Sequence, residues 1–439
     1  MKQYPKFGLL ASGVFVLTFS NTTQAQSLSE NSALSSGEQA TATISCFSQV
    51  KERVLAGNPR LKSESALLRS KHAQTRQAAL FPNPVIALEA ENFGGNQSDD
   101  NMEYTAGLSQ LIETAGKRQA RTELAKAHAK AFEIRRDITI AEIVADARVA
   151  YAEVIAAKSL LALSKDEVAI RRKAKRLISR KFHHGGALQF EVDKADVSLQ
   201  SAQVVRDQRV QELHVAKRKV ASLWGANTSD LIFSAHELRL DDPEAELFTP
   251  NVQAIPGVAY AHAKREAATK SAELQHSLAV PDVTVSAGYR RFDATDEHAF
   301  VADISVPLPV FDRNQFATKR AREKLRASQF DLANTQVEVN TELSSRRDRL
   351  RLQLRERELL EQRLLPQTEK VLSSATEAYR LGRISYLDYL DAQKTYLERR
   401  ERLVTVTLSA IRNQVAIQKL DGTLLERLTQ MDQGECHDR

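Results

Sequence analysis

One stretch of this chain occurs twice, and this repeat constrains the fold more than any other feature. The second copy, Tyr379–Gln393, reads Tyr-Arg-Leu-Gly-Arg-Ile-Ser-Tyr-Leu-Asp-Tyr-Leu-Asp-Ala-Gln. The first copy, Phe182–Ala195, has the same layout 197 positions earlier, with Gly185 at the place of Gly382. A unit that recurs in this way predicts two halves with the same architecture.

Both copies predict the tip of a helical hairpin. Long stretches with helical spacing of apolar residues run up to each glycine and away from it. A helix commonly ends at a glycine because glycine tolerates a positive φ. Beyond the second tip, Asp388 and Asp391 are three residues apart and therefore share one face of the returning helix. In the first copy, Glu191 stands at the place of Asp388.

A change of period predicts a β-hairpin in each half. Apolar and polar residues alternate over residues 86–91 and 104–109, and again over 283–290 and 300–306. This period is typical of strands with one apolar and one polar face. The parity of the faces is the same in both halves, since three residues recur 196 positions later: Tyr104, Ala106 and Leu108 as Phe300, Ala302 and Ile304.

The longest predicted element is a helix that begins after Gly116 and ends near Arg180. Seven of its residues have the alternating spacing of a coiled-coil seam. They are Leu124, Ala127, Ala131, Ile134, Ile138, Ala141 and Ala145. At about 1.5 Å per residue this helix extends for roughly 100 Å, far longer than a globular core requires.

Prolines mark further points of the repeat. Pro59 and Pro84 recur 197 positions later as Pro256 and Pro281. Pro366 falls within the long helix that precedes the second tip. It is expected to kink this helix, because proline cannot donate the helical hydrogen bond.

The N-terminus has the parts of a secretory signal peptide. Lys2 and Lys6 supply a positive start, Phe7–Phe19 is a short apolar core, and Thr23-Gln-Ala25 resembles a cleavage site. We therefore divide the chain into a signal peptide (1–25), a loose leader (26–45), a first repeat (46–240), a connector (241–252), a second repeat (253–428) and a polar tail (429–439).

Composition and motifs argue against several classes of protein. No interior stretch has some 20 consecutive apolar residues, which excludes a helical membrane protein. The net charge is +6, but 62 basic and 56 acidic residues are interspersed, which favours solvated helix faces over a nucleic-acid surface. An enzyme has little support, because there is no glycine-rich phosphate loop, no HExxH and no nucleophile elbow.

Four strands cannot form a complete structure alone. A membrane barrel needs about eight or more strands, and an open sheet with an apolar face is unstable in water. Strands pooled from several copies would solve both problems, with the apolar face toward lipid. The predicted fold class is therefore mainly α with a small β part, an oligomeric pore continued by coiled-coil helices. The predicted lipid-facing residues are Ile86, Leu88, Val283, Val285, Ala302 and Ile304, with Tyr104, Tyr289 and Phe300 as interface aromatics.

The chain resembles the TolC-like outer-membrane efflux family. The segment Tyr379–Gln393, the duplicated architecture and the signal peptide carry this resemblance, which covers about Cys46–Leu425. Four segments resemble the cobalt-zinc-cadmium resistance branch: Phe81–Pro84, Glu91–Gly95, Ser109–Arg121 and Pro307–Gln315. The resemblance implies a homotrimer with twelve pooled strands and an α-barrel through the periplasm. It also implies a periplasmic adaptor protein and a proton-driven inner-membrane pump of the RND type as partners, and no cofactor.

The resemblance also assigns roles to the tips. In the family the ring of tips contacts the adaptor, a role that carries over to Gly185, Arg380, Leu381, Gly382 and Ser385. Acids just past the second tip narrow the pore, a role that carries over to Asp388 and Asp391. Such an acidic ring attracts cations and repels itself unless a basic residue clamps it, and Arg383 or Lys194 could do so.

The residues alone leave other interpretations open. The two acids could be a solvated helix face or a catalytic pair. His183 and His184 at the first tip could be metal ligands, but adjacent residues diverge on a helix and no Cys/His cluster has zinc-site spacing. A polar tip is therefore favoured, and no metal site is predicted. Cys46 and Cys436, the only cysteines, bracket the repeats. We predict a disulfide between them in an oxidising compartment, with two unpaired thiols as the alternative.

The predicted function is that of an outer-membrane exit channel for divalent heavy-metal cations such as cobalt, zinc or cadmium. An outlet for drug efflux or for type I protein secretion is an alternative within the same class. A periplasmic coiled-coil protein without a pore is the alternative outside it.

Overall fold

The computed structural model describes residues 43–92, 102–228, 230–235, 238, 240 and 255–424. The predicted signal peptide, the leader up to residue 42, the connector 241–252, the tail 429–439 and Cys436 lie outside these residues. The disulfide therefore stays a prediction. Its described partner, Cys46, is buried, with 4% of its surface exposed.

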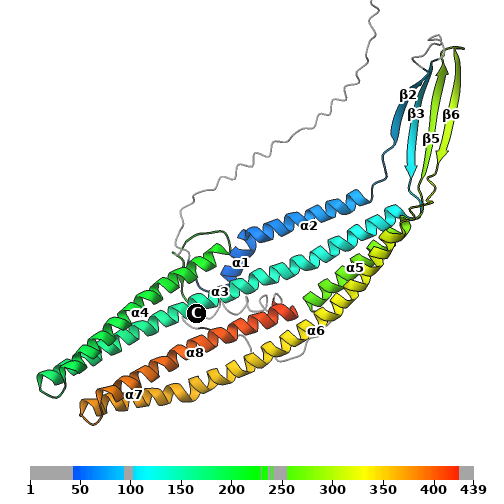
Figure 1. The fold of residues 1–439 in the computed structure, drawn as a ribbon. Helices are drawn as coiled ribbons and strands as arrows, with labels where there is room; N and C mark the ends of the chain where they lie inside the picture. Colours follow the sequence, from blue (N-terminus) through cyan, green and yellow to red (C-terminus); the bar gives the residue numbers. More distant parts are fainter. Residues whose placement is uncertain are drawn as a thin grey trace, which may run out of the picture. The chain divides into compact units, whose positions relative to one another are not determined.

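Both predicted hairpins are present, and they join into one antiparallel sheet (Figure 1). β2 (Val85–Glu91) and β3 (Glu103–Ile112) form the first hairpin, and β5 (Val283–Phe292) and β6 (Glu297–Ser305) form the second. β3 pairs with β5, so the strand order is β2-β3-β5-β6. The two repeats therefore meet in the middle of the sheet, and β2 and β6 are its edges.

One apolar face runs across all four strands. The ladder pairs Leu88 with Ala106, Ala106 with Tyr289, and Tyr289 with Phe300. This face is open: Leu88 is 82% exposed and Phe300 is 90% exposed. All the residues predicted to face lipid lie on it, so the predicted parity of the faces is confirmed.

Next to the sheet, four helices pack in the order α2-α3-α5-α6. They are α2 (Pro59–Ala78), α3 (Lys117–His183), α5 (Pro256–Ser277) and α6 (Gln315–Leu359). α3 has 67 residues, and all seven residues of its predicted seam are buried or half-buried. The long seam helix is therefore confirmed.

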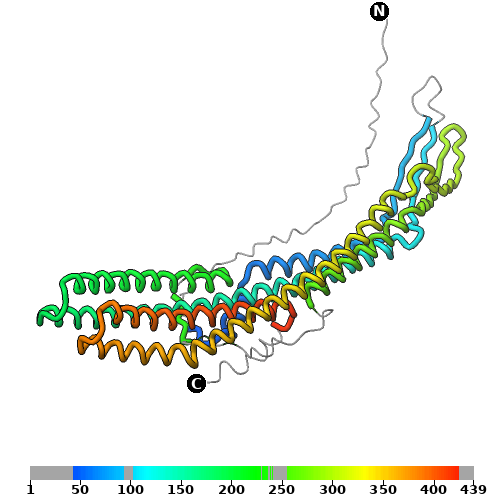
Figure 2. Tube along the Cα trace, turned by 60° about the horizontal axis from the view of Figure 1, so that its bottom comes forward, coloured from blue at the N-terminus to red at the C-terminus, as the bar shows by residue number. Residues whose placement is uncertain are grey.

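Farther from the sheet, α3 and α6 continue beside different helices. Here α3 packs against α4 (Gln189–Ser222) and α8 (Tyr386–Asp421), and α8 packs against α6 and α7 (Leu365–Arg380). Figure 2 follows the two resulting hairpins, α3–α4 and α6/α7–α8, to their tips. The order α4-α3-α8-α7 leaves α4 and α7 as the outer helices.

The largest buried apolar cluster surrounds the middle of α3. It is covered by α1 (Phe47–Gly57) and by two short parallel strands, β1 (Thr43–Ile44) and β4 (Ile232–Phe233). Lys158 on α3 donates to the carbonyl oxygens of Phe233 at 2.8 Å and Ala235 at 3.1 Å. Residues 43–44 therefore do not belong to a loose leader, and the predicted boundary at residue 45 is corrected. Two residues of strand pairing are too short to show a period in the sequence.

The long helix before Gly382 is interrupted near Pro366, as predicted. α6 ends at Leu359, a π-helical segment follows over Leu360–Leu364, and α7 begins at Leu365. Pro366 thus lies directly after the π-helical segment, and both a proline and a π-bulge are known causes of an irregularity in a long helix.

Candidate functional site

The two predicted tips have the same backbone geometry. Gly382 has φ = 74° and Gly185 has φ = 72°. At the second tip, the N–H of Arg383 donates to the carbonyl of Ala378 and the N–H of Gly382 donates to that of Tyr379. Equivalent bonds link Gly186 to Lys181 and Gly185 to Phe182. Both tips are therefore Schellman motifs that need glycine in the left-handed region.

The residues predicted to contact an adaptor are all on the surface of the tips. They are Gly185, Arg380, Leu381, Gly382 and Ser385. Arg380 donates two hydrogen bonds to Glu377, at 2.8 and 2.6 Å, and these bonds lower the pKa of that carboxyl. Leu381 is 49% exposed and presents an apolar side chain at the turn.

Asp388 has a structural role that the sequence analysis missed. Its carboxylate accepts hydrogen bonds from the backbone N–H of Ser385 at 3.0 Å and from the Ser385 hydroxyl at 2.7 Å. The Ser385 hydroxyl in turn accepts from the N–H of Asp388 at 3.2 Å, which completes a capping box at the start of α8. In the sequence, the spacing Ser-x-x-Asp before a helical stretch indicates such a capping box.

The corresponding acid of the first repeat makes one of the same contacts. Glu191 accepts from the backbone N–H of Leu188 at 3.2 Å, at the start of α4. A carboxylate in the first turn also interacts favourably with the helix dipole. Helix capping therefore accounts for an acid at this place in both repeats without reference to a pore.

The second predicted acid is placed differently. Asp391 is exposed on α8, one turn after Asp388. Among the described residues, neither acid forms an ion pair with Arg383 or Lys194, the two predicted clamps. Lys194 instead lies 5.8 Å from the centre of the Phe190 ring. The negative charge of both acids is therefore open to solvent and to other chains.

A cluster of tyrosines behind the tips joins the two hairpins. Tyr379, Tyr386 and Tyr389 are buried together with Ala174 and Ile178 of α3. The rings of Tyr379 and Tyr389 stack at 5.2 Å with an interplanar angle of 6°. Tyr386 and Tyr389 are three residues apart and share one face of α8, a spacing that the sequence analysis did not use, whereas Tyr379 lies across the turn on α7.

Burial also changes the chemistry of this cluster. Removal from water raises the pKa of Tyr379 and of Tyr386 to about 12. Lys181 of α3 lies 4.2 Å from the centre of the Tyr379 ring and donates to the Tyr379 carbonyl. The tip of the first hairpin is thus held to that of the second by a cation over an aromatic ring as well as by apolar contacts.

The sheet has its own polar network on the face opposite the apolar one. Arg290 on β5 donates to the Thr105 hydroxyl at 2.9 Å and to the Glu103 carboxylate at 3.0 Å, both on β3. Its guanidinium also lies 3.4 Å from Glu91 on β2. An arginine of the second repeat therefore ties two strands of the first repeat together.

Two features are absent from the part of the chain that the structure describes. No helix there is long and apolar enough to cross a membrane. No group of three or more His, Cys, Asp or Glu there could hold a metal ion, and His183 and His184 are exposed.

Comparisons with known proteins agree with this architecture. A family described as outer membrane efflux protein matches residues 50–226 and 253–423. The cobalt-zinc-cadmium resistance protein CzcC of Cupriavidus metallidurans is 26% identical over 374 residues, covering 83% of this chain and 87% of that protein. The nickel-cobalt-cadmium resistance protein NccC of Alcaligenes xylosoxydans xylosoxydans is 24% identical over 296 residues, covering 67% of this chain and 68% of that protein.

A solved structure shares the fold. The outer membrane protein VceC of Vibrio cholerae superimposes with a TM-score of 0.72 and 20% identity, covering 86% of this chain and 95% of that one. The family match covers most of each half of the fold. This chain therefore belongs to the outer membrane efflux protein family.

Proposed function

We propose that three copies of this chain close into an outer-membrane exit channel for divalent heavy-metal cations. The observation that carries this proposal is the set of open edges in the single chain. At every level the two outermost elements come from different repeats: β2 and β6 in the sheet, α2 and α6 next to it, and α4 and α7 near the tips.

The outer helices carry apolar stripes that nothing in the described chain covers. On α4, Phe190, Val197 and Val204 are seven residues apart and 67%, 64% and 58% exposed. On α6, Phe330 and Val337 are also seven residues apart and are 75% and 65% exposed. Apolar residues at this spacing are typical of a helix that packs against a partner helix.

A second copy supplies the partner that these edges lack. Because the two edges of one chain differ, a contact between copies would join the second-repeat edge of one to the first-repeat edge of the next. Such head-to-tail contacts close into a ring when the rotation between copies permits it. Three copies supply twelve strands, within the range of membrane barrels, with the apolar face toward lipid.

The substrate and the partners follow from the relatives and from the tips. CzcC and NccC are named for resistance to cobalt, zinc, cadmium and nickel, and we infer a divalent metal cation as substrate here. We further infer that Asp388 and Asp391 line the narrow entrance, and that the exposed tips bind a periplasmic adaptor coupled to a proton-driven RND pump. The chain acts as a conduit, and no catalytic step is proposed.

The alternatives make different predictions. An outlet for drugs or secreted proteins would complement drug sensitivity or secretion rather than metal resistance. A coiled-coil protein without a pore would form no conducting trimer. The proposal is tested by expressing the full chain, isolating trimers from outer membranes and recording single channels in planar bilayers. Complementation of metal sensitivity in a strain that lacks this gene, with its pump and adaptor intact, identifies the substrate. If the trimers conduct but restore only drug resistance, the substrate is a drug and not a metal cation.

A further inference from the structure

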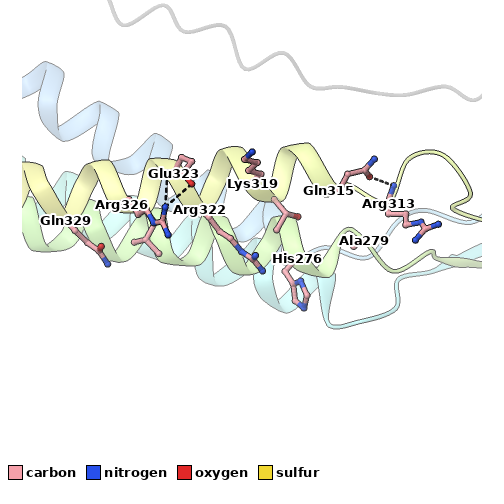
Figure 3. A pocket seen from close by; sticks show the side chains of 11 residues that line it. His276, Ala279, Arg313, Gln315, Lys319, Arg322, Glu323, Arg326 and Gln329 are labelled. Carbon is pink, nitrogen blue, oxygen red and sulfur yellow. Dashed lines mark hydrogen bonds and ion pairs between the residues drawn. The ribbon is translucent and has the colours of Figure 1, made fainter.

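A cavity with an unusual charge lies between α5 and α6, close to the sheet. Its volume is about 740 Å³, within the range of small-molecule sites. We call it the basic cleft, and its charged lining residues are His276, Arg313, Lys319, Arg322, Glu323 and Arg326. In Figure 3, Arg322 extends from α6 toward His276 of α5, and Arg326 lies beside Glu323.

Most of the positive charge in the basic cleft is uncompensated. Its single acid, Glu323, lies 3.3 Å from Arg326 and neutralises only that guanidinium. Among the described residues, Arg313, Lys319 and Arg322 form no ion pair. Other cations of these helices do have acidic partners, as Lys270 has Glu273 and Arg346 has Glu342. Three unpaired cations around one cavity favour a ligand with concentrated negative charge.

The start of α6 adds little to the attraction for an anion, so the inference depends on the side-chain cations. α6 is 45 residues long, and its first turn contains no acid. The cap residue Asn314 makes no side-chain hydrogen bond to the helix, and its amide donates instead to Gln275. The carboxylate of Asp312, just before the helix, accepts from the N–H of Asn314 at 2.8 Å and offsets part of the positive end of the helix dipole.

An apolar segment stands directly beside the basic cleft. Leu308, Val310 and Phe311 lie between β6 and α6 and are 82%, 60% and 92% exposed. Only five residues, 278–282, separate α5 from β5. The cleft is thus at the foot of the strands, where apolar side chains give way to cations. Apolar and basic residues in this order are typical of surfaces that contact anionic lipids.

We propose that the basic cleft binds the phosphate headgroup of an anionic phospholipid in the periplasmic leaflet of the outer membrane. This inference rests on the proposed function for the orientation of the strands in lipid. Lys319 and Arg322 would contact the phosphate, and Leu308 and Phe311 would lie against the acyl chains.

The test uses trimers of the full chain in detergent and native mass spectrometry. Phosphatidylglycerol, phosphatidylcholine and inorganic phosphate are titrated separately, and bound molecules are counted per trimer. The variant is Lys319→Gln with Arg322→Gln. The matched control is Arg320→Gln with Lys324→Gln, which removes the same two charges from exposed positions of α6 that do not line the cleft.

We expect wild type and control to bind phosphatidylglycerol preferentially, and the cleft variant to bind it roughly tenfold to thirtyfold more weakly, at about 1 kcal/mol per charge. Each of the following outcomes would overturn the inference. Equal loss in the control would mean diffuse surface charge. Tight binding of inorganic phosphate alone would identify a free anion as the ligand. Loss of trimers in the cleft variant alone would make the cleft a contact between copies. Single-channel recording of the same trimers tests the proposed function separately. Trimers that conduct but show no preference for phosphatidylglycerol would refute lipid binding in the basic cleft and leave the channel function intact.

Discussion

The Nζ atom of Lys117 lies 2.7 Å from Oδ1 of Asp282, and this ion pair joins the two repeats where strands give way to helices. The Lys117 side chain is 6% exposed and that of Asp282 is 23% exposed. Thr114 completes the contact, donating its N–H to Asp282 at 2.9 Å and its hydroxyl to the Pro281 carbonyl at 2.6 Å. The motif Ser109–Arg121 thus forms a joint between the sheet and the long helix.

Removing one partner of this pair should destabilise the trimer. Lys117→Met leaves a half-buried carboxylate without its cation, and we expect the free energy of unfolding to fall by about 1–3 kcal/mol. Thermal unfolding of trimers followed by light scattering and circular dichroism measures it. The control is Lys126→Met, which breaks the exposed Lys126–Glu123 pair on the same helix and should cost less than about 0.5 kcal/mol.

The same pair gives an acid-dependent stability. Burial alone would raise the pKa of Asp282, but hydrogen bonds from Lys117 and Thr114 outweigh it and hold the pKa below the ordinary 3.8. A depressed carboxyl pKa stabilises the folded chain above pH 3.8, and this contribution is lost as the pH falls through the lower, folded value. Asp282→Asn should therefore have a lower free energy of unfolding than wild type at neutral pH, and this difference should become smaller below pH 3.8. A difference that does not change with pH would show that the charged pair contributes nothing to stability.

A third prediction concerns the paired glycines in the middle of the sheet. Gly107 lies opposite Gly288. A Cβ atom at Gly288 would meet the Ala106 carbonyl oxygen at 3.0 Å and the Gly107 Cα at 3.2 Å, whereas one at Gly107 would meet nothing closer than 3.6 Å. Gly288→Ala should cost about 1–3 kcal/mol, and Gly107→Ala should be neutral or slightly stabilising. Unfolding curves that rank the two variants in the opposite order would contradict this register.

The lipid face can be tested by placing a charge on it. Val285 is the third residue of β5, close to its helical end, whereas Ala287 lies near the middle, between Leu108 and Ala302. Ala287→Arg should cost roughly 2–4 kcal/mol and Val285→Arg less, because the penalty falls away from the bilayer midplane. Ser286→Arg on the polar face is the control. Urea unfolding in lipid vesicles measures all three, and equal tolerance would refute the assignment of faces.

The acids past the second tip should differ in effect. Hydrogen bonds from Ser385 lower the pKa of Asp388, so it stays charged down to below pH 3.8. Asp391→Asn should alter single-channel current and divalent block while leaving thermal stability within about 0.5 kcal/mol of wild type. Asp388→Asn should do the same and also lower the thermal unfolding temperature, because it removes the carboxylate from the capping box of α8. Unchanged current and block in the double variant would remove both acids from the pore.

The last prediction separates the backbone of the second tip from its surface. No atom lies within 4 Å of a Cβ built on Gly382, so a substitution meets no clash and only its positive φ is strained. Gly382→Val should abolish metal resistance while trimers still form. Gly382→Asn tolerates the left-handed region better. If the Gly382→Asn variant confers resistance, the backbone conformation of the turn is what resistance requires. If Gly382→Asn also lacks resistance, docking requires the surface that a glycine without a side chain leaves open. Full resistance in Gly382→Val would place the docking surface elsewhere.

Much of this fold could be predicted from the sequence because its features are local and periodic. The glycine tips, the seam of α3 and the alternation of the strands each depend on residues close together in the chain. The repeat extended these predictions, since a feature in one half could be checked against the other. The parity of the sheet faces was predictable for the same reason.

The sequence by itself thus determined two similar halves, each with a hairpin of strands and a hairpin of helices, and the family to which the chain belongs. Only the tertiary structure decided that β3 pairs with β5, that Lys117 meets Asp282, and that Lys319 and Arg322 of α6 line one cleft with His276 of α5. Each of these contacts joins residues far apart in the chain. No period in the sequence encodes such a pairing, because its geometry depends on how whole helices and strands pack.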